Sequence, residues 1–201
     1  MSLKRTLSQE DFESAALRLG CDVAAIQAVA EIEQGPFGAF HLDGRPVILL
    51  ERHLVYRFAQ RKLGTDIARR WAAAHPGVCN PRRGGYGKSA AQHDRLAQAA
   101  KLDREIALRA CSWGLFQILG DNFHAAGHDS LQSFVNAMYG GADEHLAAFV
   151  AFVLSKPRLA EALRVHDWHT FAEIYNGPDQ EAHDYEGRIG RAHERIRREA
   201  A

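Results

Sequence analysis

The sequence predicts a mostly α-helical fold with at most one short β-hairpin, built as a single domain over residues 1–201. Apolar residues recur at helical spacing over most of the chain. Serine, aspartate, proline or glycine residues stand where these apolar stretches begin and end. Apolar residues also make up 46% of the chain, which is enough to build a full core in one domain. No linker, internal repeat or low-complexity segment divides the sequence.

Capping residues place the ends of several expected helices. Ser8 followed by Asp11 is typical of a capping box, and Asp167 is a typical N-cap. Pro157 suits the first turn of a helix. The short apolar run over residues 47–50 is either a strand or the approach to the next helix. We expect helices over residues 8–19, 22–33, 51–62, 66–74, 130–139, 142–154, 167–174 and 181–199, with two more between residues 89 and 111 and another from Pro157.

The longest stretch without a helical pattern is residues 75–88, HPGVCNPRRGGYGK. Long irregular loops are uncommon in compact domains and often take part in function. We therefore weigh two interpretations of this stretch, a functional loop and a flexible surface excursion.

Composition and charge argue against several classes of partner. The 25 basic and 25 acidic residues give a net charge of zero, whereas nucleic-acid-binding domains usually carry a basic excess. No apolar run is long enough to span a membrane, and residues 1–12 are too polar for a signal peptide. We expect a monomer that is made in the cytoplasm and binds neither nucleic acid nor membrane.

Cysteines and histidines give no sign of a metal or a cofactor. Cys21, Cys79 and Cys111 are far apart and lack a metal-binding spacing, so we expect free thiols in a reducing compartment. The eleven histidines are scattered and form no HExxH-type ligand set. The sequence therefore predicts no metal site and no cofactor.

A glutamate lies at the junction between an apolar helix and a glycine-rich turn within residues 24–40. Ile26, Val29 and Glu33 follow an i, i+3, i+7 pattern and so share one helical face. Glu31 falls off that face and should be solvated. Burial would raise the pKa of Glu33, and a carboxylic acid in that state suits general acid catalysis near neutral pH. The alternative is a residue at a helix end that points into water.

Residues 112–118, SWGLFQI, form a second candidate segment. Ser112, Trp113 and Gly114 precede an expected apolar helix turn that carries Gln117. Gly114 permits close backbone approach, and the amide of Gln117 offers donors and an acceptor, a combination that suits a polar carbohydrate or peptide. The alternative is a helix start at which Trp113 and Phe116 are simply core residues.

Tyr175, Asn176 and Gly177 form a third candidate segment at a helix end. An aromatic ring and an amide can bind a sugar by stacking and hydrogen bonding, but the same residues also form an ordinary helix stop.

The arginine-rich C-terminal helix also has two interpretations. Its interleaved glutamates favour a solvated, ion-paired face over a polyanion-binding face.

In this order, the three segments resemble the lysozyme-like superfamily, which includes goose-type lysozymes and soluble lytic transglycosylases. The sequence is more closely similar to the N-acetylmuramidase domain of phage endolysins and related bacterial proteins, and this resemblance covers most of the chain. The segments that carry it are AVAEIEQGPFGAF, LDGRPVILLERHLVYR, QHDRLAQAAKLDREIALRACSWGLFQILGDNF and FAEIYNGP.

The resemblance implies a lysozyme-like fold and an enzyme that degrades the cell wall. Such an enzyme cleaves the bond between N-acetylmuramic acid and N-acetylglucosamine in the glycan strands of peptidoglycan, which it reaches after release from the cell or by dedicated export. By position, Glu33 would be the catalytic acid. The substrate-binding residues implied by position are Ser112, Trp113, Gly114, Gln117, Tyr175 and Asn176.

A second carboxylate would be needed to position water or to stabilise a cation. Glu51 is the first candidate because it follows an apolar run and begins a helix, whereas the alternative is a carboxylate that the helix N-terminus satisfies. Asp43 and Asp121 are further candidates. Without such a group the enzyme would be a lytic transglycosylase, which closes the sugar on itself without water. Arg52 and His53 flank Glu51 and would contact peptide stems or acetamido groups.

The turn over residues 34–40 departs from the family pattern. It is one residue longer than usual, Gln34 stands where a serine is common, and Phe37 adds bulk. This departure motivates a third interpretation, a peptidoglycan-binding module without catalysis.

Overall fold

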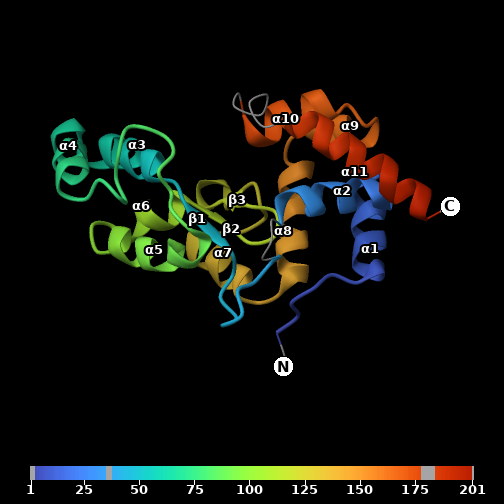
Figure 1. Cartoon of the computed structure of the whole chain (residues 1–201), viewed down its shortest axis with the longest axis horizontal. Helices are drawn as coiled ribbons and strands as arrows, with labels where there is room; N and C mark the ends of the chain where they lie inside the picture. The colour runs from blue at the N-terminus through green and yellow to red at the C-terminus, as the bar shows by residue number, and fades with distance from the viewer. Residues whose placement is uncertain (1–2, 35–37, 178–183, 201) are drawn as a thin grey trace.

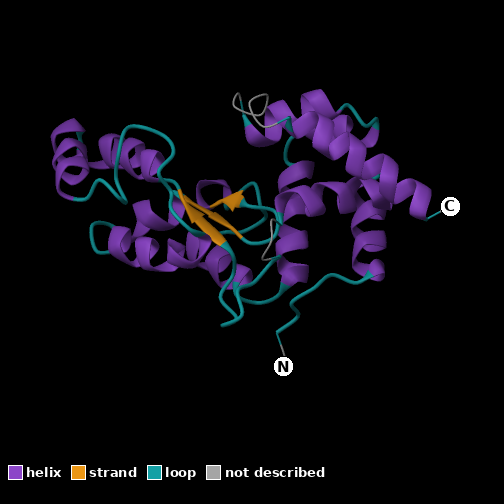
Figure 2. Ribbon diagram, viewed as in Figure 1, coloured by secondary structure: helices purple, strands orange, loops and turns teal. Residues whose placement is uncertain are grey.

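The computed structural model describes residues 3–34, 38–177 and 184–200, in which eleven α-helices surround one small antiparallel sheet (Figures 1 and 2). The predicted mostly helical class is confirmed. One 3₁₀ turn, η2 (Ser89–Ala91), precedes α5, and another, η3 (Gly120–Asn122), follows the sheet. The helices are α1 (Gln9–Leu19), α2 (Val23–Glu33), α3 (Arg52–Leu63), α4 (Thr65–Ala74), α5 (Gln92–Ala100), α6 (Arg104–Arg109), α7 (Leu131–Met138), α8 (Ala142–Leu154), α9 (Pro157–Arg164), α10 (Trp168–Asn176) and α11 (Tyr185–Glu199).

Several helix ends follow the capping residues of the sequence. Ser8 and Asp11 form both hydrogen bonds of a capping box at the start of α1, and the Asp167 side chain accepts a hydrogen bond from the backbone N–H of Thr170 at the start of α10. α10 continues to Asn176, two residues beyond the expected end. The described part of the expected C-terminal helix is α11, whereas residues 181–183 and the turn at residues 35–37 lie outside the described residues.

The sheet contains β1 (Ile48–Leu50), β2 (Cys111–Trp113) and β3 (Ile118–Leu119) in the order β1-β2-β3. It therefore has one strand more than the single hairpin expected. Residues 112–118, which we expected to lead into a helix turn, instead form the β2–β3 hairpin. Gly114 and Gln117 adopt positive φ angles of 72° and 47° in the tight turn between these strands. The prediction was wrong here because a short apolar run does not separate a strand from a helix by its period.

The sheet lies between two groups of helices. Figure 1 shows α3, α4, α5 and α6 on one side and α1, α2, α9, α10 and α11 on the other, with α8 beside the sheet. α8 is buried on most of its surface, as its apolar sequence predicted. Phe116 from the hairpin turn stacks on Phe149 of α8, with ring centroids 4.4 Å apart. This contact fixes the hairpin against the helical core.

The state of the cysteines and the ion pairs of α11 match what we expected from the sequence. Cys21, Cys79 and Cys111 are free cysteines. Arg191 pairs with Asp184, and Arg195 pairs with Glu199, so α11 carries the predicted ion-paired face. Within the described ranges, no helix combines the length and the apolar character that crossing a bilayer requires.

Candidate active site

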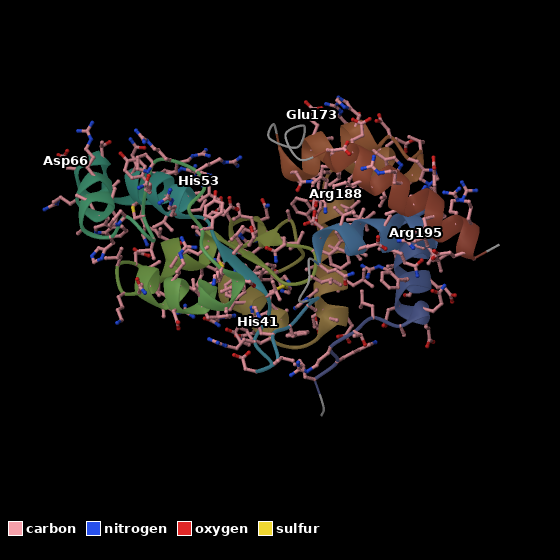
Figure 3. All side chains as sticks on the ribbon, in the orientation of Figure 1. His41, His53, Asp66, Glu173, Arg188 and Arg195 are labelled. Carbon is pink, nitrogen blue, oxygen red and sulfur yellow. The ribbon has the colours of Figure 1, made fainter. Side chains whose placement is uncertain are left out.

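A cavity of about 650 Å³ is lined by residues from both groups of helices and from the sheet. Figure 3 shows His53 on α3 and Arg188 on α11 on opposite sides of the space between the two groups. The predicted catalytic and binding residues that line the cavity are Glu33, Glu51, Ser112, Gln117, Tyr175 and Asn176. The fold therefore brings together residues from α2, the start of α3, the hairpin and α10.

Glu33 is the last residue of α2 and lies at the end of a buried apolar face. Ile26 and Val29 on that face are fully buried, whereas Glu31 is exposed and pairs with Arg195. Burial raises the pKa of Glu33 to about 8, and the positive charge of Arg188 opposes this shift. The direction of this shift agrees with the predicted perturbation of Glu33, and a pKa of about 8 favours the protonated carboxyl group at neutral pH.

Tyr185, the first residue of α11, is a site residue that the sequence did not reveal. Its hydroxyl group donates a hydrogen bond to Oε1 of Glu33, and its side chain also lines the cavity. Residue spacing gives no signal for this contact, because the two residues come from opposite ends of the chain. The hydrogen bond fixes the orientation of the Glu33 carboxyl group.

Tyr175 and Asn176 play different parts at the end of α10. The hydroxyl group of Tyr175 donates a hydrogen bond to the backbone oxygen of Phe116 at 2.7 Å, so it anchors the hairpin turn. The Nδ2 atom of Asn176 is buried and has no hydrogen-bond partner among the described residues. A buried, unsatisfied amide in a cavity is a ready donor for a bound ligand.

Glu51 is the N-cap residue of α3, but its side chain makes no capping hydrogen bond. No capping hydrogen bond therefore supports the alternative of a carboxylate that the helix N-terminus satisfies. Instead, its Oε1 atom accepts a hydrogen bond from the Ser112 hydroxyl group at 3.2 Å. Burial raises the pKa of Glu51, and the Ser112 hydrogen bond and the charge of Arg83 oppose that shift. A second, partly dehydrated carboxyl group thus lines the same cavity as Glu33.

His53 does not line the cavity but contacts two residues that do. Burial and the charges of Arg83 and Arg57 lower the pKa of His53 to about 4, so its imidazole is neutral. Its Nε2 atom accepts a hydrogen bond from Nε of Arg83 at 3.1 Å, and its Nδ1 atom lies 3.2 Å from the hydroxyl oxygen of Tyr86. His53 therefore holds Arg83 and Tyr86, which line the cavity, rather than contacting a ligand itself.

Residues 75–88 are irregular, and Arg83, Gly84 and Tyr86 from this stretch line the cavity. The functional interpretation of this loop is therefore favoured over a surface excursion. Arg52 lies behind the loop, where its Nη1 atom donates a hydrogen bond to the backbone oxygen of Pro76. Arg52 is thus a residue that supports the loop, not a cavity residue.

Two predicted binding residues lie behind the cavity wall. Trp113 is 1% exposed, and its Nε1 atom donates a hydrogen bond to the backbone oxygen of Leu108. A Cβ atom added at Gly114 would lie 2.7 Å from Nδ1 of His145, so this glycine permits close packing of the hairpin on α8. The structure therefore places Trp113 and Gly114 in the core, as the alternative interpretation of this segment anticipated for Trp113.

The other candidate carboxylates lie elsewhere. Asp43 pairs with Arg45 on the surface, and Asp121 pairs with Arg109. Neither residue lines the cavity. Glu51 is therefore the predicted second carboxylate that the fold brings into the same cavity as Glu33.

Comparison with known proteins identifies the family and the fold of this chain. The crystal structure of the Burkholderia AP3 phage endolysin is similar to this chain, with a TM-score of 0.84 and 42% sequence identity over 98% of this chain and 73% of that one. This similarity confirms the expected lysozyme-like fold. No curated protein matches the chain. A family model described as Muramidase, N-acetylmuramidase, matches residues 22–197, which include every cavity residue named above. The chain therefore belongs to the N-acetylmuramidase family.

Proposed function

We propose that this chain is a peptidoglycan-degrading muramidase that cleaves the bond between N-acetylmuramic acid and N-acetylglucosamine, with Glu33 as the general acid. The observation that carries the proposal is the position of Glu33, at the end of a buried helical face and in the wall of a cavity of about 650 Å³. Burial there raises the pKa of Glu33 to about 8, which favours a protonated carboxylic acid at neutral pH. Membership of the family supports the class of substrate, and similarity to a phage endolysin supports action on the cell wall.

In this mechanism Glu33 donates its proton to the glycosidic oxygen while the bond breaks through an oxocarbenium-like transition state. Tyr185 holds the carboxyl group in position from α11. The Nδ2 group of Asn176, which has no hydrogen-bond partner among the described residues, is a donor to the bound sugar. Gln117 already donates its Nε2 hydrogen to the backbone oxygen of Gly114 at 2.8 Å, which leaves its side-chain oxygen to accept from a sugar hydroxyl or acetamido group.

Glu51 is the proposed second carboxylate. In its ionised form it either activates the attacking water or stabilises the positive charge on the sugar. The Ser112 hydrogen bond orients one of its oxygens and favours ionisation. A carboxylate in this position favours hydrolysis over a reaction in which the sugar closes on itself.

The first test is Glu33→Gln, which keeps the size of the side chain and removes the proton. We expect a folded protein whose lysis of purified sacculi falls at least ~10²-fold. Glu31→Gln is the matched control, because Glu31 lies on the exposed face of the same helix. Undiminished lysis by Glu33→Gln would refute the assignment of the acid.

The second test is the identity of the products by mass spectrometry. Hydrolysis leaves reducing ends on N-acetylmuramic acid, and Glu51→Gln should abolish their formation. Products with 1,6-anhydro ends would instead identify a lytic transglycosylase. Sacculus binding without any loss of turbidity would identify a non-catalytic module.

A further inference from the structure

A second polar cluster lies at the opposite end of α2 from Glu33. Asp22 is the N-cap of α2, His166 lies in the turn between α9 and α10, and His193 lies on α11. One oxygen or nitrogen atom from each side chain lies within 4.8 Å of the corresponding atoms of the other two. The three residues come from distant parts of the chain and match no ligand spacing, which is why the sequence predicted no metal site.

We propose that Asp22, His166 and His193 bind a Zn²⁺ ion that joins the start of α2 to α11 and to the turn before α10. The proposal is independent of the muramidase reaction, because none of the three residues lines the cavity that contains Glu33.

The ligand set matches this metal. The Nε2 atoms of His166 and His193 lie 2.9 Å and 3.1 Å from the same carboxylate oxygen, Oδ2 of Asp22. The other oxygen, Oδ1, caps α2 by accepting a hydrogen bond from the backbone N–H of Ala25 at 2.7 Å. Two imidazole nitrogens and one carboxylate oxygen are ligands that Zn²⁺ takes in three-residue sites, with water in a fourth position. Asp22 can therefore serve the helix and the metal with different oxygens.

His166 reaches the cluster from a left-handed backbone position. Its φ angle is 58°, a conformation in which histidine, asparagine and aspartate are enriched among residues other than glycine. Its Nε2 atom is buried and makes no aligned hydrogen bond within the described ranges, although Oδ2 of Asp22 is close. A metal ion would satisfy the lone pair of this nitrogen.

The surroundings suit an ion that keeps one water ligand. The side chains of His166 and Asp22 are 31% and 38% exposed, whereas that of His193 is 5% exposed. Trp168 packs against both imidazoles, with ring centroids 5.5 Å from His166 and 5.2 Å from His193. The site is therefore open to solvent on one side and held by an aromatic ring on another.

The experiment measures zinc binding by the whole chain after dialysis against a chelator. Titration calorimetry should detect one tight Zn²⁺ ion per chain, and the melting temperature should rise by about 5 °C or more at 100-fold excess over Kd. Co²⁺ should give the visible absorption of a nitrogen- and oxygen-ligated ion, whereas Mg²⁺ should leave the melting temperature unchanged. Failure of Zn²⁺ to stabilise the wild-type chain would overturn the proposal.

Two variants assign the site. His166→Asn removes a ligand while asparagine tolerates the positive φ angle, and Asp22→Asn keeps the N-cap. Both should fold without metal and lose the zinc-induced rise in melting temperature. His169→Asn is the control, because His169 is an exposed histidine on α10 that contacts Glu186 outside the cluster. Zinc binding that persists in both ligand variants, or that His169→Asn alone abolishes, would show that the metal binds elsewhere and that the histidines only donate hydrogen bonds to Asp22.

Discussion

The hydroxyl group of Tyr185 donates a hydrogen bond to the carboxyl group of Glu33 from a position 152 residues later in the chain. The bond joins the first residue of α11 to the last residue of α2 at the wall of the cavity. A donor to a carboxylate oxygen favours the ionised form, so we expect the Tyr185 hydroxyl group to oppose the rise in the pKa of Glu33 that burial causes. Burial raises the pKa of Glu33 and the charge of Arg188 lowers it, and we expect the hydrogen bond to enter the same balance.

Replacement of Tyr185 by phenylalanine should disturb this balance and the orientation of the acid. We expect kcat to fall about 10-fold, which corresponds to the loss of one hydrogen bond of ordinary strength. The alkaline limb of the pH–rate profile should also move to higher pH. Tyr139→Phe is the control, since Tyr139 is 43% exposed and does not line the cavity. An unchanged profile would show that the hydrogen bond does not act on the acid.

The pH dependence of catalysis should follow the ionisation of Glu33. Activity requires its protonated form, so it should decline as the pH rises through about 8. The charge of Arg188 lowers this pKa, and Arg188→Gln should therefore move the alkaline limb upward. Arg191→Gln is the matched control on α11, because Arg191 pairs with Asp184. Rates of glycan cleavage over the pH range give the measurement, and equal shifts in both variants would exclude a specific effect of Arg188.

Glu33 should also make the fold less stable in alkaline solution. Its pKa is about 8 in the folded chain and 4.5 in a free side chain, so the folded state binds more protons between these values. The free energy of unfolding therefore falls as the pH rises from 4.5 to 8, by up to about 1.4 kcal/mol per pH unit. Urea unfolding at several pH values should show that Glu33→Gln becomes progressively more stable than the wild type. A difference that is constant with pH would contradict this account.

Asn176 should contribute to binding without contributing to stability. Asn176→Ala removes a buried amide donor that has no partner in the described part of the chain, so the melting temperature should stay the same or rise. The amide contacts substrate in the proposed complex, so KM should rise about 10-fold while kcat changes less. Steady-state kinetics on soluble glycan fragments separates the two parameters. A lower melting temperature with unchanged KM would indicate a purely structural role.

Local signals explain what could be predicted from the sequence. The apolar spacing that ends at Glu33 and the capping residues Ser8, Asp11 and Asp167 depend on neighbours within one or two helical turns, and the structure confirms them. The choice of Glu51 over Asp43 and Asp121 came from its place after an apolar run, and the fold brings it to the cavity.

Contacts across the chain explain what could not be predicted. Tyr185 meets Glu33, and His193 meets Asp22, only because α11 packs on α2, and no spacing within the sequence records that packing. The hairpin at residues 112–118 is similar, since its strand β2 pairs with β1 from far earlier in the chain. Trp113 was misplaced for the same reason, because an aromatic residue on a three-residue strand gives no sign of which face is buried.

The position of Glu33 at the carboxyl end of α2 has a consequence for how the acid is tuned. The peptide dipoles of a helix place partial negative charge at that end, which disfavours a second negative charge on a side chain there. Helix polarity thus acts in the same direction as burial and keeps the proton on Glu33. The same glutamate in the first turn of a helix would ionise more readily. The direction in which the chain runs through α2 therefore helps to keep the pKa of Glu33 high.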